Sequence, residues 1–430
     1  MKIDFTKIKT VHFIGIGGIG ISAIARMMLA EGVRVSGSDV AESKVTEELR
    51  KCGAEISIGQ GISLVPKGAD LIVYSNALLN YDPKFFKALQ SLQIPMRSYP
   101  EVLGKISAEK FTIAIAGTHG KTTTTAMTGT VLKDCGLDPT IVVGSILARE
   151  GTNFVAGKSK YLVVEADEYR RAFLNLSPRI LAITNIDADH LDYFKDIGDI
   201  ISAFGELVAK IPKDGFLVVN SHAPNMAEIV RGARCRIADW STILAPKISL
   251  HGAHNVANAK VALAVAKILG VDETGAWKSL SEFRGTWRRF EYKGKTARGA
   301  LVYDDYAHNP AKVRAALAGA REAHPKDKIR VVFQPHLFSR TKSLLAEFAK
   351  SFGDADEVVL LPIYAAREHD DGSVSSEVLA AEIKMSQTQV SVLRTFEEAE
   401  KYLTKFSAGD VIITMGAGDI TTLSDKLISK

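Results

Sequence analysis

Short apolar runs alternate with longer mixed stretches along most of the chain. The runs are rich in Val, Ile and Leu, and they end at glycine, acidic or other polar residues. Such runs are typical of strands buried in a parallel sheet, and the stretches between them have the composition of helices. We predict strands at 11–14, 33–37, 71–75, 111–116, 161–164, 180–184, 300–303, 330–333, 357–361, 390–393 and 411–414. We predict helices at 21–30, 83–91, 99–106, 123–135 and 256–269. The expected fold class is therefore α/β.

The stretch Gly117-Thr118-His119-Gly120-Lys121-Thr122 stands between a predicted strand and a predicted helix. This order is what a phosphate-binding loop needs, because glycines let backbone N–H groups face a polyphosphate at a helix N-terminus. Lys121 would reach the terminal phosphates, and the Thr122 hydroxyl would bind Mg²⁺. The loop is shortened, since Ile115 stands where the full Walker pattern has glycine. The alternative is an ordinary strand–turn–helix, and the Gly-Lys-Thr sequence favours nucleotide phosphate binding.

A second glycine turn lies near the N-terminus. Gly15-Ile16-Gly17-Gly18-Ile19-Gly20 follows a short strand, and Ser38-Asp39 ends the next strand about 20 residues on. This pattern predicts a pyrophosphate-bearing ligand on the helix N-terminus and a role for Asp39 near a ribose. It does not require nicotinamide. A purely structural glycine turn is the alternative.

Two changes in composition divide the chain. The polar stretch Ser107-Ala108-Glu109-Lys110 precedes the phosphate loop and its strand, and a basic, aromatic stretch at 282–290 precedes a new α/β alternation. We expect three domains, at 1–107, 108–285 and 286–430. Their expected architectures are Rossmann-like, P-loop ATPase-type α/β, and again Rossmann-like.

Acidic residues follow two predicted strands of the middle domain. Glu165-Ala166-Asp167-Glu168 ends one strand, and Asp187-Ala188-Asp189-His190 follows another. Ligands gather at the carboxyl ends of parallel strands, so these residues and Thr122 are expected at one edge. Mg²⁺ prefers hard oxygen ligands, which makes Glu165 the first candidate, whereas the imidazole of His190 suits softer metals. Solvated acidic loops are the alternative, and the presence of two such clusters favours a metal site.

Other polar clusters are less specific. Asn255 and Asn258 share one face of a predicted helix, where helix capping is the simpler interpretation and purine recognition the other. Residues 304–310 and 334–341 follow strands of the last domain and carry Asp, His and Arg. Taken alone, each of these two segments is most simply interpreted as a surface loop.

Composition limits the class of protein. Apolar content of 46%, charged content of 24% and a net charge of +5 over 430 residues are ordinary for a soluble globular protein and do not suggest a nucleic-acid binder. The three cysteines are far apart in the sequence, which fits a reducing compartment. The N-terminus lacks an apolar signal core, and no apolar run is long enough to span a bilayer. We expect a cytoplasmic protein without membrane insertion.

Taken together, these motifs resemble the Mur ligase family over nearly the whole chain. The resemblance rests on the order and spacing of several segments, namely 12–20, 116–124, 165–168, 185–187 with Asp189 and His190, His254-Asn255 with Asn258, Arg288-Arg289-Phe290, 304–308 and 334–336. It implies an ATP-dependent, Mg²⁺-requiring ligase of peptidoglycan synthesis. The implied substrates are UDP-N-acetylmuramate and L-alanine, joined at the lactyl carboxylate through an acyl phosphate.

The resemblance also implies a role for each domain and for particular residues. The first domain would bind the UDP-sugar through Gly15, Gly17, Gly18, Gly20, Ser38 and Asp39. ATP would contact Gly117, Thr118, His119, Gly120, Lys121, Thr122, Thr123, Asn255, Asn258, Arg288, Arg289 and Asp305. The metal ligands would be Thr122, Glu165 and His190, and the catalytic residues Lys121, His190 and His308. Tyr306, His336 and Arg340 would frame the amino acid. For the two asparagines, this implication replaces the capping interpretation.

The amino-acid loops depart from the usual family pattern at two positions. Arginine is common where this chain has Leu337, and a second histidine is common where it has Asn309. A related ligase that adds a recycled peptide to the same sugar is one alternative. An NAD-dependent oxidoreductase, resting on residues 15–39, is another, but it leaves the Lys121 loop unexplained. A nucleotide-switch protein without chemistry is a third. The sequence does not determine the oligomeric state.

Overall fold

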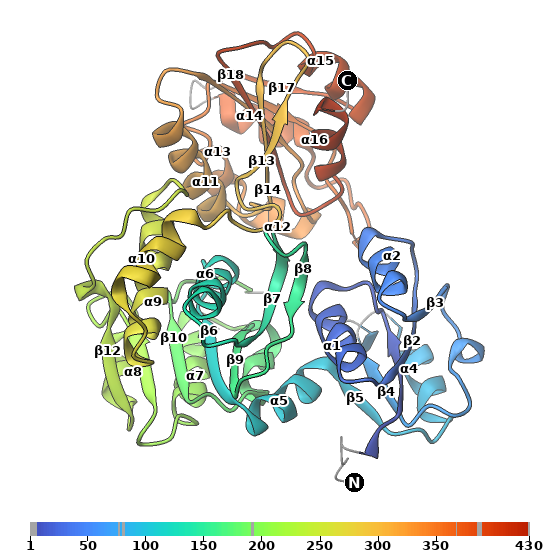
Figure 1. Ribbon diagram of the computed structural model, residues 1–430. Coiled ribbons are helices and arrows are strands. Elements are labelled where there is room, and N and C mark those ends of the chain that lie inside the picture. Colours follow the sequence, from blue (N-terminus) through green and yellow to red (C-terminus); the bar gives the residue numbers. More distant parts are fainter. Residues whose placement is uncertain are drawn as a thin grey trace. The chain divides into compact units, whose positions relative to one another are not determined.

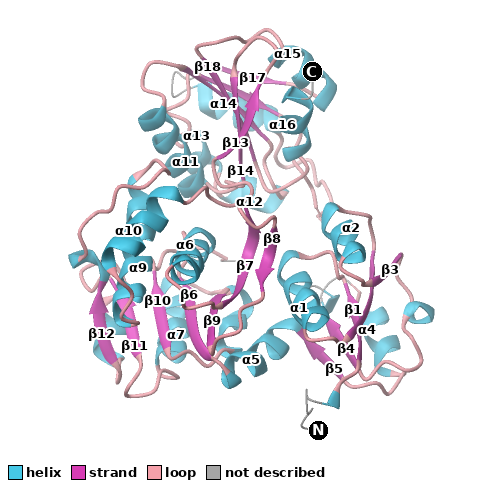
Figure 2. Ribbon diagram, viewed as in Figure 1, coloured by secondary structure: helices cyan, strands magenta, loops and turns pink. Residues whose placement is uncertain are grey.

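The computed structural model describes residues 7–75, 78–79, 82–190, 193–366, 368–384 and 389–428. They contain three sheets, each flanked by helices (Figure 1, Figure 2). The chain divides into two compact units, one formed by Met1–Lys247 with Ala257–Phe283 and the other by Ile248–Val256 with Arg284–Lys430. Below they are called the N-terminal unit, which holds two sheets, and the C-terminal unit, which holds the third. The predicted α/β class is confirmed.

The first sheet has the order β3-β2-β1-β4-β5, and all its pairings are parallel. Its elements are β1 (Thr10–Ile14), α1 (Ile19–Ala30), β2 (Arg34–Asp39), α2 (Lys44–Lys51), β3 (Glu55–Ile58), β4 (Leu71–Tyr74), α4 (Pro83–Gln90), β5 (Met96–Ser98) and α5 (Tyr99–Glu109). β1 pairs with both β2 and β4, so the strand order reverses beside it. The turn after β1 therefore lies at the switch point where ligands bind in open α/β sheets.

The second sheet has seven strands in the order β12-β11-β10-β6-β9-β7-β8. Its elements are β6 (Phe111–Ala116), α6 (Lys121–Asp134), β7 (Thr140–Leu147), β8 (Thr152–Val155), β9 (Tyr161–Glu165), β10 (Ile180–Ile183), α7 (Ile197–Val208), β11 (Phe216–Val219), α8 (Ala227–Gly232), β12 (Arg236–Asp239), α9 (Ala253–Ile268) and α10 (Glu273–Glu282). Among the described strand pairs of this sheet, only the β7–β8 hairpin is antiparallel. The carboxyl ends of β6, β9 and β10 consequently meet at one edge of the sheet.

The third sheet has the order β13-β14-β18-β15-β16-β17. Its elements are β13 (Glu291–Lys295), β14 (Leu301–Asp305), α11 (Pro310–Ala323), β15 (Lys328–Phe333), α12 (Phe338–Ser343), α13 (Leu345–Ala349), β16 (Glu357–Leu360), α14 (Ser376–Lys384), β17 (Gln389–Val392), α15 (Phe396–Leu403), β18 (Asp410–Met415) and α16 (Thr421–Ile428). The polar stretch at 294–299 begins inside β13, an antiparallel edge strand with a bulge near Gly294. Its polar sequence suits a strand with one open edge.

The core follows the predicted apolar runs. In the N-terminal unit, one continuous apolar cluster includes Phe13 and Ile24 from the first sheet and its helix, and Ala114, Val164 and Leu181 from the second sheet. Helix α6 starts at Lys121, two residues before the predicted start, so Thr122 lies in its first turn. Among the described helices, none is long and apolar enough to cross a membrane.

Candidate active site

The phosphate loop (residues 117–122) leaves β6 and enters α6 through two glycines in the left-handed region. Gly117 has φ of 129° and Gly120 has φ of 82°. A Cβ atom at Gly117 would lie 2.0 Å from the Thr184 hydroxyl, and one at Gly120 would lie 2.4 Å from the Asn258 side-chain oxygen. Both positions therefore require glycine for space as well as for conformation. The loop leads into the N-terminus of a 14-residue helix, as an anion site requires.

Lys121 is the cation of this loop. Its Nζ donates to the carbonyl oxygens of Gly117 at 2.6 Å and Thr118 at 3.2 Å, and forms an ion pair with Glu168 at 2.7 Å. Burial lowers the pKa of Lys121, but the carboxylates of Glu168 and Asp167 outweigh burial and raise the pKa above its ordinary value. Lys121 therefore stays an ammonium ion, which is the form that offsets phosphate charge.

Thr122 and Glu165 lie next to each other, as the predicted metal pair requires. The Thr122 hydroxyl donates to Glu165 Oε1 at 2.9 Å, and the backbone N–H of Gly144 donates to Glu165 Oε2 at 2.8 Å. They meet because β6 and β9 are parallel neighbours, with Ile115 opposite Glu165. A hydroxyl and a carboxylate side by side are the hard oxygen ligands that Mg²⁺ prefers.

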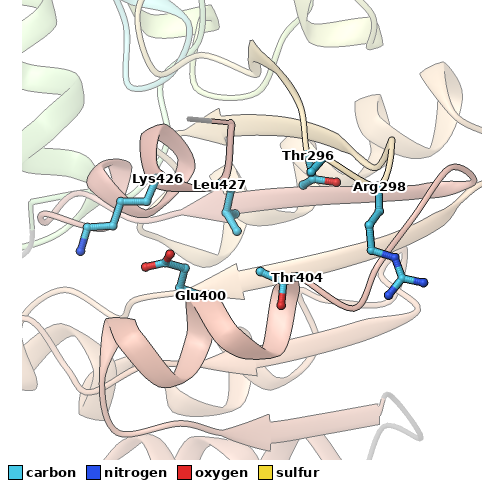
Figure 3. Close-up of a pocket in the computed structure, with 7 residues that line it drawn as sticks. Thr296, Arg298, Glu400, Thr404, Lys426 and Leu427 are labelled. Carbon is cyan, nitrogen blue, oxygen red and sulfur yellow. The ribbon is translucent and has the colours of Figure 1, made fainter. Parts of the chain in front are cut away.

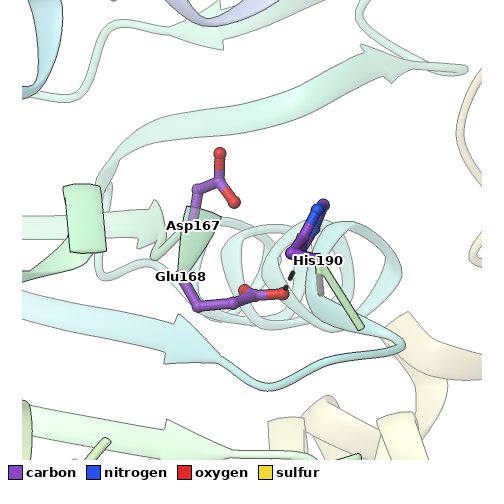
Figure 4. A group of neighbouring side chains, drawn as sticks. All are labelled: Asp167, Glu168 and His190. Carbon is purple, nitrogen blue, oxygen red and sulfur yellow. Dashed lines mark ion pairs between the residues drawn. The ribbon is translucent and has the colours of Figure 1, made fainter. Parts of the chain in front are cut away.

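A second cluster consists of Asp167, Glu168 and His190 (Figure 4). Their ligand atoms lie within 4.8 Å of one another, and His190 Nε2 is 3.8 Å from Glu168 Oε1. Burial and the neighbouring Glu168 raise the pKa of Asp167. The structure thus groups the predicted ligand His190 with two carboxylates that our ligand prediction left out. Their positions just after β9 were the sequence signal for them.

The rest of the loop is held by the strand end of β10. Asn185 accepts from the His119 backbone N–H at 2.9 Å and donates to the His119 carbonyl at 3.0 Å. The Thr118 hydroxyl accepts from the Asp187 N–H at 2.9 Å, and Asp187 lies 3.8 Å from the His119 ring. Thr123 follows on α6 and is buried. These contacts fix the loop against the residues that follow β10.

The two predicted purine-binding asparagines have different surroundings. Asn258 belongs to the N-terminal unit and is buried against the turn at Gly120. Asn255 belongs to the C-terminal unit, where its amide donates to the His251 carbonyl at 2.7 Å. Asn258 therefore lies at the phosphate loop itself, whereas the Asn255 amide is bonded to the segment just before α9.

The N-terminal glycine turn (residues 15–20) is built from backbone contacts to the end of β2. Gly15 has φ of 75°, and its N–H donates to the Ser38 carbonyl at 2.8 Å. The Gly17 N–H donates to Asp39 Oδ2 at 2.8 Å, and a Cβ atom at Gly17 would lie 2.9 Å from that oxygen. Gly18 precedes α1 as its N-cap. Asp39 therefore shapes the turn directly, besides any ligand contact.

In the C-terminal unit, Arg288 and Asp305 form several hydrogen bonds at the carboxyl ends of β14 and β18. Arg288 donates from Nε to Asp304 at 3.1 Å and from its terminal nitrogens to the carbonyls of Gly416 and Gly418. Asp305 accepts from the backbone N–H groups of Phe290 and Ala307, each at 2.7 Å. Burial raises the pKa of Asp305 to about 6. Arg288 thus ties β14 to the end of β18.

The remaining predicted residues of this unit gather around aromatic rings. Arg289 lies over the Tyr306 ring at 5.3 Å, and the rings of Tyr306 and His308 are 5.1 Å apart. The rings of His308 and His336 are 6.1 Å apart, and Arg340 Nη1 is 3.2 Å from His336 Nδ1. Burial lowers the pKa of His308 well below its usual value, so its ring is neutral.

Two further features belong to this unit. Leu337, beside His336, has φ of 72°, an uncommon backbone conformation for a leucine, between β15 and α12. The described pocket in Figure 3 is lined by Thr296, Arg298, Glu400, Thr404 and Lys426 among others and contains none of the predicted site residues.

A lysine-bearing glycine loop beside carboxylates at the edge of a parallel sheet is typical of nucleotide-phosphate-binding proteins. Family models match along most of the chain. The descriptions are "Mur ligase family, catalytic domain" at 10–111, "Mur ligase middle domain" at 115–243 and "Mur ligase, glutamate ligase domain" at 288–418. The chain belongs to the Mur ligase family. It is therefore a ligase, and ATP is the implied cofactor.

Individual relatives agree with this assignment. The chain is 40% identical to the UDP-N-acetylmuramate–L-alanine ligase of Caldanaerobacter subterraneus subsp. tengcongensis, covering 100% of this chain and 99% of the relative. It is 38% identical to the enzyme of the same name from Clostridium kluyveri, covering 100% of both. A solved UDP-N-acetylmuramate–alanine ligase from Thermotoga maritima matches with a TM-score of 0.82 and 28% identity, covering 97% of this chain and 98% of the other. A murein peptide ligase from Psychrobacter arcticus shares the fold, with a TM-score of 0.74, 24% identity, and 97% and 98% coverage.

Proposed function

We propose that this protein is an ATP-dependent ligase that joins L-alanine to the lactyl carboxylate of UDP-N-acetylmuramate in peptidoglycan biosynthesis. The observation that carries the proposal is the Lys121–Thr122–Glu165 arrangement, in a chain 40% identical over its whole length to a ligase of that name. The arrangement supplies the phosphoryl-transfer chemistry, and the full-length similarity supplies the substrates. The first alternative is addition of a recycled peptide. A murein peptide ligase shares the fold, but its 24% identity gives this alternative less support than the 40% identity to the alanine ligase gives the proposal.

The proposed reaction has two steps. The terminal phosphoryl group of ATP passes to a lactyl carboxylate oxygen, which gives an acyl phosphate and ADP. The alanine amine then attacks the acyl carbon, inorganic phosphate leaves with the C–O bond electrons, and the amine loses a proton as the amide forms. Catalysis of this kind is mainly positioning and charge neutralisation. Lys121, which is an ammonium ion held at the loop, offsets the charge of the transferring group.

Mg²⁺ fits the donor set of the N-terminal unit. Thr122 and Glu165 would hold one ion, and His190 would contribute to a second together with Asp167 or Glu168. A bound Mg²⁺ neutralises phosphate oxygens that the single Lys121 ammonium leaves uncompensated. Hydroxyl and carboxylate oxygens favour this hard cation, and the imidazole is the less usual ligand.

The proposal assigns the two other substrates by region. The N-terminal glycine turn, with Ser38 and Asp39, binds the UDP-sugar. In the C-terminal unit, the proposal assigns ATP binding to Arg288, Arg289 and Asp305 and a catalytic role to His308. Tyr306, His336 and Arg340 would frame alanine. The same proposal keeps the domain limits at 1–107, 108–285 and 286–430, which three separate sheets support. It also places the protein in the cytoplasm, which suits three cysteines without disulfides.

Phosphate release from ATP tests the function. Purified protein receives MgATP, UDP-N-acetylmuramate and one amino acid at a time. We expect release that requires the sugar nucleotide and is fastest with L-alanine. Release that needs a tripeptide instead of alanine would favour the recycling ligase. Slow release that ignores both sugar and amino acid would indicate a nucleotide switch, and tight NADH binding without release would indicate an oxidoreductase.

A further inference from the structure

Tyr99 lies against the first turn of α1, beside the N-terminal glycine turn. A Cβ atom added to Gly20 would be 3.0 Å from Cε2, 3.1 Å from Cζ and 3.2 Å from the hydroxyl oxygen of Tyr99. Gly20 therefore has no side chain because the Tyr99 ring fills that space. The contact places a phenol hydroxyl at a helix N-terminus whose position in the fold is the switch point of the first sheet.

The position of Tyr99 is fixed by its own helix. Tyr99 is the first residue of α5, and Glu101 accepts from both the Ser98 N–H at 2.7 Å and the Ser98 hydroxyl at 2.8 Å. Pro100 follows directly and fits the start of a helix. The ring is thus held by a capped helix start, and its orientation does not depend on a flexible loop.

The first turn of α1 is in turn anchored to the phosphate-loop sheet. The buried Asn153 of β8 donates to the Ile19 carbonyl at 2.6 Å and to the Ser22 hydroxyl at 2.9 Å. β8 pairs with β7, and Gly144 of β7 donates its N–H to Glu165. α1 lies beside this hairpin in Figure 1. One hairpin therefore holds both the glycine turn's helix and the carboxylate of the proposed metal site.

The Tyr99 hydroxyl is a neutral donor. Burial, followed by the charges of Asp167 and Glu165, raises the pKa of Tyr99 above its usual value, so the hydroxyl keeps its proton at neutral pH. Within the described ranges, no protein group forms a hydrogen bond with this hydroxyl. A phenol donates readily to an anion, and this hydroxyl lies against the first turn of α1, next to the glycine turn.

We propose that the Tyr99 hydroxyl donates a hydrogen bond to an anionic oxygen of the bound sugar nucleotide, between the start of α1 and the acidic end of β9. The inference rests on the proposed function and adds a substrate-binding residue to it. A neutral donor is suited to this place, because it attracts the anion without forming an ion pair with Glu165 or Asp167. Two anionic groups of the sugar nucleotide qualify, the pyrophosphate and the lactyl carboxylate.

Tyr99→Phe removes only the hydroxyl and keeps the ring against Gly20. We expect affinity for UDP-N-acetylmuramate to fall by roughly 10-fold or more, as for a lost hydrogen bond to a charged group, while KM for ATP and alanine stays within about twofold. Calorimetric titration and initial rates measure the two quantities. Tyr161→Phe is the matched control, since Tyr161 begins the strand that ends at Glu165 and so lies at the opposite end of β9.

Two ligands separate the possible acceptors. UDP-N-acetylglucosamine carries the pyrophosphate and lacks the lactyl carboxylate. Equal losses for both ligands in Tyr99→Phe identify the pyrophosphate, and a loss confined to UDP-N-acetylmuramate identifies the carboxylate. Unchanged affinity for both ligands overturns the proposal. Wild-type protein that binds neither ligand instead refutes the proposed function, so the two failures are distinct.

Gly20→Ala is a second variant that approaches the same contact from the other side. Its Cβ would press on the Tyr99 ring and displace the hydroxyl. We expect it to weaken the same ligand as Tyr99→Phe does and to add little when the two changes are combined. Fully additive losses would mean that Gly20 acts on the ligand independently of Tyr99, against the proposal. Thermal unfolding of every variant checks that the fold is retained.

Discussion

The N-terminal glycine turn and the phosphate loop are both strand–turn–helix segments of the N-terminal unit, yet their surroundings differ sharply. The first is closed by Ser38 and Asp39, and its helix α1 has no acidic residue in its first turn and no basic residue in its last turn. The second carries Lys121, which is paired with Glu168, and Thr122, which is bonded to Glu165. Both present a helix N-terminus, but only one adds an ammonium ion and metal-type ligands to it.

This difference distinguishes a segment that can bind phosphate from one that can also assist phosphoryl transfer. A helix N-terminus with glycines in front of it is sufficient to hold a phosphate group. Moving a phosphoryl group also requires charges placed where the transition state gains charge. In the proposed ligase, the glycine turn therefore holds the sugar nucleotide, while the phosphate loop holds ATP and assists the transfer of its terminal phosphoryl group. The variants below test whether the two segments divide the work in this way.

The largest expected effect is that of Lys121→Ala. Loss of the ammonium ion removes charge stabilisation from phosphoryl transfer, so turnover should fall by at least about 100-fold while the protein stays folded. Phosphate release at saturating substrates measures it. Lys133→Ala is the control, because Lys133 lies on the same helix α6 and pairs with Glu150 away from the loop. Turnover close to that of the control would refute the role of Lys121.

Two glycine variants should affect the two segments separately. Gly17→Val places a side chain against Asp39 and should weaken UDP-N-acetylmuramate binding by roughly 10-fold or more, with MgATP binding retained. Gly120→Ala places an alanine in the left-handed backbone conformation and against Asn258. It should weaken MgATP binding, with UDP-N-acetylmuramate binding retained. Titration of each ligand into each variant measures this. If either variant loses both ligands equally at unchanged stability, the division of work is wrong.

Thr122→Val tests the proposed metal pair. Valine has nearly the shape of threonine but no hydroxyl, so the concentration of Mg²⁺ needed for half-maximal activity should rise by roughly 10-fold. Activity measured against Mg²⁺ concentration gives the answer. Thr130→Val, another buried threonine of α6, should leave the Mg²⁺ requirement unchanged. An unchanged requirement in Thr122→Val would exclude its hydroxyl as a ligand.

The smallest expected effect concerns His12, which lies in β1, the strand before the glycine turn. The strand before the phosphate loop, β6, contains no histidine. Burial lowers the pKa of His12 to about 4, and its Nδ1 lies 2.9 Å from the Ser36 hydroxyl. The unfolded chain takes up this proton at higher pH than the folded protein. The contribution of His12 to the free energy of unfolding is therefore fully present above pH 6.5 and is lost as pH falls toward 4. Between pH 7 and 5.5 the loss should be about 1 kcal/mol.

Denaturant unfolding at several pH values, for wild type and His12→Gln, measures this contribution. The variant should be less stable at pH 7 and should lack that part of the acid sensitivity. The control His222→Gln changes an exposed histidine of the N-terminal unit and should keep the wild-type pH dependence. Parallel curves for wild type and His12→Gln would show that His12 does not titrate as stated.

Several features were predictable because they depend on residues close in sequence. The apolar runs predicted the strands β1, β6, β9, β15 and β18, and the glycine patterns predicted both turns. The strand-end position of Glu165 predicted its meeting with Thr122, since parallel neighbours end at the same edge. The β7–β8 hairpin was not predicted, because its register depends on pairing with β9 and on packing against α1.

Local pattern and motif spacing were sufficient to predict the α/β class, the two glycine turns and the family. Which charges face one another depends instead on how the chain folds in three dimensions. Glu168 pairs with Lys121 from 47 positions away, and His190 joins Glu168 and not Glu165. Tyr99 meets Gly20 because α5 packs against α1. Such contacts depend on the order of strands in the sheet and on helix packing, and neither is encoded within a single run of residues.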